Sequence, residues 1–171
     1  MVRSAREALA IAGAIQAEVP RRGRPPDEGL PPESEQVLPH SLVRGTRGYI
    51  EKIVIQINGS YERGWFDACA VMIRRLLETL IIEAFEHHKL APTIQNPAGD
   101  FLYLRDLITK TLAERSWNLS RNSKAALPRL KDIGDKSAHS RRYNAHRADI
   151  QSSIADLRVV VQELTYLAGL K

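Results

Sequence analysis

The chain has 171 residues and a net charge of +5. This length fits one domain with an extension and is too short for two domains that each bury a sizeable core. Hydrophobic residues make up 43% and charged residues 26%, as in ordinary soluble globular proteins, and the lone Cys69 excludes an intramolecular disulfide. Arg74, Arg75 and Glu78 interrupt the most apolar run, which excludes a membrane span, and the first residues are too weakly apolar for a signal peptide. We therefore expect a cytoplasmic protein with no membrane partner and a packed Cys69 thiol.

The N-terminal part of the chain divides into two predicted segments. Residues 1–19 form an extension that could fold as a short Ala-rich docking helix. Residues 20–40 contain six prolines and two glycines, which oppose helix formation and predict a linker. Residues 41–171 carry the predicted domain, and a larger protein partner could dock on residues 1–40.

Two helices are predicted first in the domain. Thr46 is expected to cap a helix on which Tyr49, Ile50, Ile53, Val54 and Ile57 share one apolar face. Asn58-Gly59 should end this helix or mark a weak point before a turn near Gly64. The run from residue 65 to 90 is the longest helical pattern. Its apolar residues cover most of the circumference, which predicts a central helix.

Three further helices complete the pattern. Asp100 is expected to cap a short one, and another covers residues 119–138, where Pro128 predicts a kink or a fresh start and Gly134 should loosen the end. A single long terminal helix has apolar residues from Ile150 to Ala168 at spacings of three and four, followed by Gly169 as its C-cap. No segment alternates like a strand, so we predict an all-α bundle of four to five helices.

The positive charge is concentrated between residues 119 and 147. This tract contains eight Lys and Arg residues and only two Asp residues, so its net charge is +6. Such a tract is typical of a surface that binds a polyanion. The residues expected to contact nucleic acid are Arg129, Lys131, Arg141 and Arg142. A solvated basic face, or one that meets an acidic partner protein, would have the same composition.

Two motifs of the chain resemble the HEPN superfamily. They are SYERGWFDACAVMIRRLLETLI and, before the terminal helix, LKDIGDKSAH, and the similarity covers residues 45 to 169. The resemblance is to the uncharacterised branch associated with prokaryotic restriction, abortive-infection and toxin–antitoxin proteins. It implies a homodimer, with two motifs facing across a two-fold axis, RNA as a partner, and metal-independent endoribonuclease chemistry in active members.

The resemblance also implies a catalytic set. The family's histidine corresponds to His139 and its polar residue to Asp135, but Gly134 stands where the family has an arginine. Glycine lacks the guanidinium that would stabilise charge on phosphorus, so weak or no cleavage is expected. Lys131 or Lys136 could supply a point charge instead.

Several candidate residues have alternative interpretations. His139 could serve only as a helix C-terminal residue that interacts with the terminal carbonyls. Arg141 and His146 form a second Arg-to-His frame in the same tract. Arg74 or Arg75 with Glu78 has the spacing of an ion pair within a helix, and the resemblance would let that pair support the motif. No spacing resembles a metal-ligand set, so neither a metal nor another cofactor is expected.

Three functions remain open from the sequence. The first is an RNA-binding or polyanion-binding module of a prokaryotic defence or toxin–antitoxin system, with weak or no catalysis. The second is a metal-independent endoribonuclease that uses His139. The third is a non-catalytic dimerisation or adaptor protein that docks through its N-terminal tail.

Overall fold

The computed structural model of the protein describes residues 36–171, so the predicted extension 1–19 and most of the predicted linker lie outside the described residues. The described part is helical and contains no strand, which confirms the predicted all-α bundle. Its elements are η2 (His40–Leu42), α2 (Gly48–Glu62), α3 (Phe66–His87), η3 (Ala91–Ile94), α4 (Leu104–Ala113), α5 (Arg121–His139), α6 (Arg147–Gln151) and α7 (Ile154–Leu167). Within these residues, no helix is long and apolar enough to cross a membrane.

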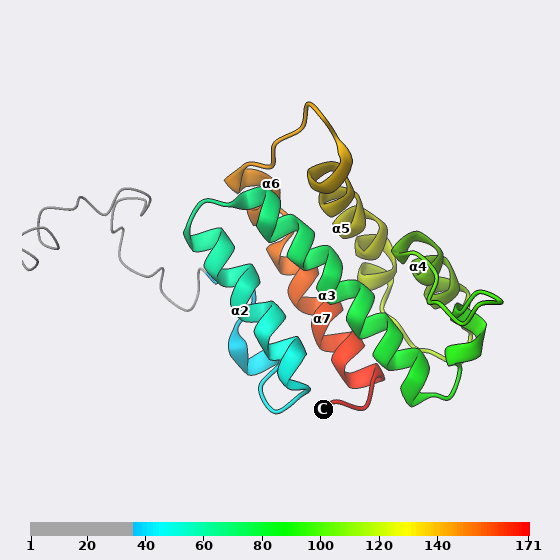
Figure 1. Cartoon of the computed structure of the whole chain (residues 1–171). Coiled ribbons are helices and arrows are strands. Elements are labelled where there is room, and N and C mark those ends of the chain that lie inside the picture. Colours follow the sequence, from blue (N-terminus) through cyan, green and yellow to red (C-terminus); the bar gives the residue numbers. More distant parts are fainter. Residues whose placement is uncertain (1–35) are drawn as a thin grey trace, which may run out of the picture. The chain divides into compact units, whose positions relative to one another are not determined.

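Helix α3 is the centre of the bundle, as its apolar circumference predicts. It packs against α2, α4, α5 and α7 and also touches η3 and α6. Figure 1 shows α2 beside it on one side, α5 and α4 on the other, and α7 behind. Its buried residues therefore point in several directions: they are Cys69, Ala70, Ile73, Leu76, Leu77, Leu80, Ile81, Glu83, Ala84 and Phe85.

The predicted N-cap of α2 is wrong, and of the two predicted ends only the turn near Gly64 is confirmed. The N-cap is Arg47, and the Thr46 hydroxyl donates instead to the Val43 carbonyl at 2.6 Å. The helix also continues through Asn58 and Gly59 to Glu62, although the turn at Gly64 occurs as predicted, with φ of +73°. Glycine in a helix interior costs only about 1 kcal/mol, which the buried face of α2 easily outweighs.

Asn58 has a tertiary role that local propensity does not reveal. Its amide nitrogen donates to the Leu38 carbonyl at 2.7 Å, and its amide oxygen accepts from the Leu38 N–H at 3.1 Å. Val37 and Leu38 are fully buried, and Arg158 on α7 donates to the Val37 carbonyl at 3.1 Å. Residues 36–40 of the predicted linker thus belong to the folded bundle.

The start of α4 differs from the sequence prediction, whereas α5 begins close to its predicted start. Tyr103, rather than Asp100, is the N-cap of α4, while Ser120 caps α5 by accepting from the Ser123 N–H at 3.1 Å. Helix α5 continues through Pro128 with no fresh start. Pro128 is exposed, so the carbonyl that loses its partner one turn earlier can bond to water.

The predicted terminal helix is in fact two helices. A turn at Ser152 and Ser153 separates α6 from α7, and the buried Ser153 hydroxyl donates to the Ile150 carbonyl at 2.7 Å. The predicted C-terminal end is confirmed, since Gly169 has φ of +62°. His87 lies so close to Gly169 that any Cβ there would collide with the imidazole.

Candidate nucleic-acid interface

The crossing of α3 and α5 explains the glycine at position 134. A Cβ on Gly134 would lie 2.6 Å from the Arg74 Cβ and 2.9 Å from the Ala70 carbonyl oxygen. Both distances are shorter than real Cβ contacts, so only glycine allows the two helices to approach this closely. Gly134 is buried at this crossing, and α5 continues past it to His139, close to the predicted end of the helix.

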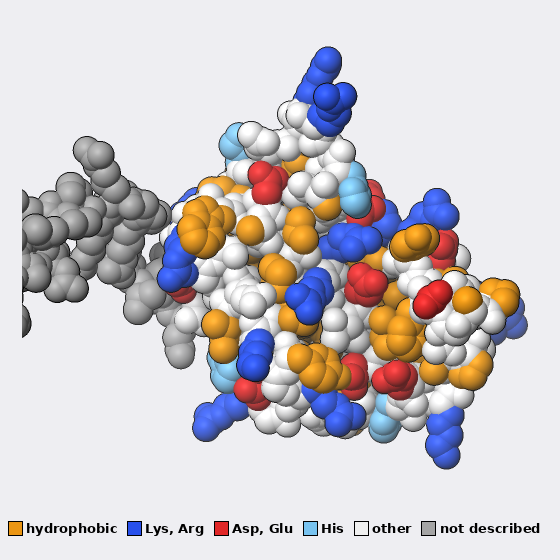
Figure 2. Space-filling model, in the orientation of Figure 1, with side chains coloured by type: hydrophobic (Ala, Val, Ile, Leu, Met, Phe, Trp, Pro, Cys, Tyr) orange, Lys and Arg blue, Asp and Glu red, His pale blue; other side chains and the backbone are white. Residues whose placement is uncertain are grey.

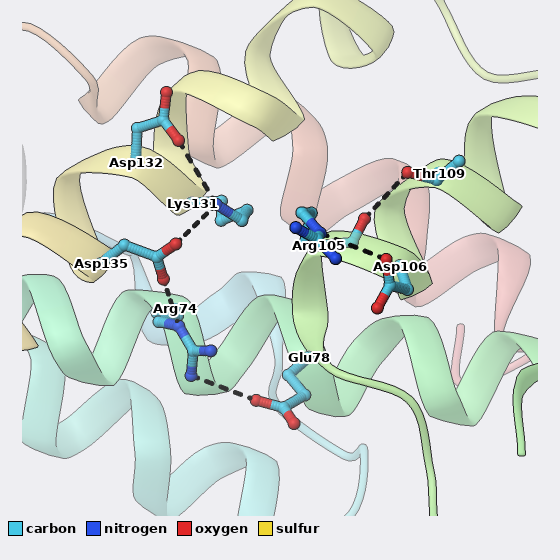
Figure 3. Close-up of polar contacts among 8 residues, drawn as sticks. All are labelled: Arg74, Glu78, Arg105, Asp106, Thr109, Lys131, Asp132 and Asp135. Carbon is cyan, nitrogen blue, oxygen red and sulfur yellow. Dashed lines mark hydrogen bonds and ion pairs between the residues drawn. The ribbon is translucent and has the colours of Figure 1, made fainter. Parts of the chain in front are cut away.

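One carboxylate, that of Asp135, joins the two helices beside this crossing. Its Oδ1 accepts from Arg74 Nε at 2.7 Å and its Oδ2 from Lys131 Nζ at 2.5 Å. The outer ends of the cluster are weaker, with Arg74 Nη1 at 3.5 Å from Glu78 Oε2 and Lys131 Nζ at 3.4 Å from Asp132 Oδ1. Figure 3 shows the chain of contacts running from α5 to α3.

The contact between Asp135 and Lys131 favours the charged form of both groups. Partial burial acts to raise the pKa of Asp135, but the hydrogen bonds and charges of Lys131 and Arg74 outweigh it and hold that pKa below its ordinary value. The hydrogen bond to Asp135 in turn raises the pKa of Lys131. Asp135 is therefore an ionised carboxylate that pairs with two cations at once, Arg74 and Lys131.

An open groove of about 430 Å³ lies over this cluster between α3, α5 and the start of α4. It is lined by Arg74, Tyr103, Arg105, Lys131, Asp135 and His139. Three cations against one carboxylate give these lining residues a formal charge of +2 with His139 neutral. Lys131 and Arg105 reach into the space from opposite helices (Figure 3), so an anion could contact both.

Sequence reasoning missed two of the lining residues. Tyr103 and Arg105 lie outside the basic tract, in a segment where positive and negative charges balance. The Arg105 guanidinium is mostly exposed and its Nε is 3.2 Å from Asp106 Oδ1 on the same helix. Only the packing of α4 against α3 and α5 brings these two side chains to His139.

The basic tract does not form one continuous positive surface. Arg129 and Lys131 are two residues apart, which places them about 200° apart around α5. Arg129 therefore faces α7, where its Nη2 is 2.7 Å from Asp156 Oδ2, while Lys131 faces the groove. Both cations have acidic partners in the same molecule, and Figure 2 shows Lys and Arg side chains spread among acidic and hydrophobic ones.

The remaining predicted cations are exposed. Lys136 lies on the outer face of α5, and Arg141 and Arg142 lie in the loop that follows His139. None of the three side chains has an acidic partner within the described residues. Arg141 and Arg142 follow His139 by two and three residues, so they continue the positive charge beyond that end of the groove.

The predicted ion pair on α3 is confirmed for Arg74, which pairs with Glu78. Arg75 is exposed and does not line the groove. His146, from the alternative frame, is the N-cap of α6, and its backbone N–H donates to Asp149 Oδ2 at 2.8 Å. His139 is consequently the histidine that lines the groove, at the exposed last residue of α5.

No group of three or more His, Cys, Asp or Glu within residues 36–171 is arranged to hold a metal ion. Comparisons of the chain with protein-family models, with curated proteins and with solved structures found no match.

Proposed function

We propose that this protein binds RNA through the groove between α3, α4 and α5, with weak or no cleavage of its own. The observation that carries the proposal is the convergence of Arg74, Arg105, Lys131 and His139, from three separate helices, around one open space. The resemblance to the HEPN superfamily is the reason to choose RNA among polyanions. It also leads us to propose a cytoplasmic homodimer in a prokaryotic defence or toxin–antitoxin system.

Asp135 lowers the affinity of the groove for phosphate but does not prevent phosphate from binding. Its two oxygens already accept from Arg74 and Lys131, so part of the positive charge is neutralised before any phosphate arrives. Each of these cations has further N–H donors that Asp135 does not use, and Arg105 faces the space from the other side. A phosphate can thus bind as a second acceptor, and modest salt-sensitive affinity is expected.

The same geometry supports the proposal of weak or no catalysis. Arg74 lies against Gly134, but two of its nitrogens are near carboxylates, Nε beside Asp135 and Nη1 beside Glu78, and the groove of one protomer carries one imidazole. Proton transfer from the 2′-OH and to the leaving 5′-oxygen usually needs a positioned group for each. A single exposed His139 supports binding more strongly than turnover.

A pair of matched variants tests the groove. Arg105 and Arg129 are both mostly exposed arginines with one acidic partner, but only Arg105 lines the groove. We expect Arg105→Ala to weaken binding of a fluorescein-labelled 12-nucleotide RNA and to lower the salt slope by about 0.7, the value for one phosphate contact on a single strand. Arg129→Ala should change neither quantity.

The opposite pattern would refute the proposal. Binding lost in Arg129→Ala and kept in Arg105→Ala would assign the polyanion to the α5–α7 face. No salt-dependent binding by the unsubstituted protein would refute RNA binding altogether.

One observation favours endoribonuclease activity as the second candidate. The Arg74 side chain lies against Gly134 and lines the same groove as His139, so α3 could supply the guanidinium that α5 lacks. In that reaction the 2′-oxygen attacks phosphorus, the bond to the 5′-oxygen breaks, and His139 accepts or returns the proton. Cleavage in EDTA that disappears in His139→Ala would establish it. If RNA stays intact with both the unsubstituted protein and His139→Ala, RNA binding without cleavage is the remaining function.

A further inference from the structure

Tyr103 is the most exposed large hydrophobic side chain of residues 36–171, with 81% of the residue accessible to solvent, and it lines the groove. It has no hydrogen bond, ring contact or ion pair through its side chain within the described part of the chain. The aromatic face of Tyr103 is therefore open to solvent at the edge of the groove.

The backbone around Tyr103 is firmly held. Its carbonyl accepts from the N–H groups of Asp106 and Leu107 at 2.8 and 3.0 Å, and the preceding Leu102 N–H donates to the Ile94 carbonyl at 2.9 Å. Leu104 is fully buried. Because both neighbours are anchored, the ring of Tyr103 is directed outward by the backbone, and only its own torsions remain free.

The chemistry around the ring matches a nucleotide. Arg105, two residues further on, and Lys131, across the groove, supply cations for a phosphate, while the ring offers an apolar face for a base. Aromatic rings beside positive charge are the usual way in which proteins hold unpaired bases, since every base has a face that can stack.

We propose, resting on the function proposed above, that Tyr103 is a stacking platform for an unpaired base and that the groove therefore selects single-stranded over duplex RNA. The base lies on the Tyr103 ring and an adjacent phosphate contacts Arg105 and Lys131. A-form duplexes keep their bases stacked on each other, so the ring gains nothing from them, and duplex binding depends on the cations alone.

The test compares two exposed tyrosines. Tyr166 on α7 is 77% exposed and lines a different groove of about 700 Å³, so it is the control for Tyr103. The probes are a labelled 12-nucleotide single strand, a 12-base-pair duplex and inorganic polyphosphate as a competitor without bases. Fluorescence anisotropy measures each affinity, and circular dichroism checks that each variant is folded.

We expect Tyr103→Ala to weaken single-strand binding by about 5- to 150-fold, the range measured for loss of one stacked base. Its salt slope should stay unchanged, because no phosphate contact is removed. Duplex and polyphosphate binding should stay at the level of the unsubstituted protein. Tyr103→Trp should retain single-strand binding, and Tyr166→Ala should match the unsubstituted protein throughout.

Two results would overturn the proposal and are distinguishable from failure of RNA binding itself. If the protein binds single strands with a normal salt dependence but Tyr103→Ala binds them as well as Tyr166→Ala does, the platform is refuted and the proposed function survives. If Tyr103→Ala weakens polyphosphate as much as RNA, the residue acts on the phosphate site and no base is stacked. If the unsubstituted protein binds none of the probes, the proposed function fails first.

Discussion

Replacing Gly134 by alanine tests the close approach of α3 and α5. In an exposed helix this change stabilises by about 1 kcal/mol, because alanine has the higher helix propensity. Here the added Cβ would lie 2.6 Å from the Arg74 Cβ and 2.9 Å from a backbone oxygen of α3, roughly 1 Å inside the optimal separation of carbon atoms. Overpacking of this kind costs about 1–3 kcal/mol. We therefore expect Gly134→Ala to lower the free energy of unfolding by up to about 2 kcal/mol net.

Gly59 provides the matched control. It also lies inside a helix, but the nearest atom to a methyl group added there is the flexible end of the Arg63 side chain, at 3.0 Å. Gly59→Ala should therefore stabilise the protein by about 0.5–1 kcal/mol. Urea unfolding followed by circular dichroism at 222 nm measures both values. If the two substitutions change the unfolding free energy in the same direction, the close approach does not constrain position 134, and another reason must explain the missing arginine.

Further substitutions and measurements address the polar cluster and the core. Asp135→Asn should tighten RNA binding and raise the salt slope by up to about 1.4, because two cations are released to phosphate; an unchanged slope would show that they do not reach the ligand. Folding lowers the pKa of Asp135 from its ordinary value of 3.8. The ionised carboxylate therefore stabilises the fold above pH 3.8, and this stabilisation is lost as pH falls through the folded pKa. In urea titrations, the difference in unfolding free energy between the unsubstituted protein and Asp135→Asn should therefore shrink in acid. Asn58→Ala should cost about 1–3 kcal/mol in the same assay, since the buried Leu38 loses partners for both its N–H and its carbonyl, and a neutral result would refute that anchoring. Burial raises the pKa of Cys69 to about 12, so its thiol is protonated and inaccessible in the native protein at pH 8. A thiol reagent should therefore modify Cys69 only as fast as the surrounding structure unfolds locally or globally.

The candidate site was only partly accessible from the sequence. His139 and Asp135 were found only through the resemblance to the HEPN superfamily, and Lys131 because it lies in the basic tract. Arg74 was found because its spacing from Glu78 is that of an ion pair within a helix. Arg105 and Tyr103 were missed because nothing in their local segment departs from an ordinary helix start. Arg129 was included because the tract was treated as one surface, whereas helical geometry directs it to Asp156 on α7.

The errors in the predicted helix caps and helix ends have one physical cause. Thr46 and Asp100 are good capping residues by type, yet Arg47 and Tyr103 hold the cap positions, because the buried faces of α2 and α4 decide where those helices begin. A fresh start at Pro128 and a helix end at Asn58-Gly59 were among the expected alternatives, but both helices continue through these residues. In each case the free energy of packing the apolar face exceeds the local preference of about 1 to 3 kcal/mol.

The sequence by itself determined the helical class, the central position of α3 and the glycine end of the terminal helix, because these depend on hydrophobic period and on residues with special backbone freedom. Only the tertiary structure decided why position 134 is glycine, which cations converge and which are neutralised. Those outcomes depend on the distances between helices far apart in the chain, and a pattern of residue types carries no direct measure of such distances.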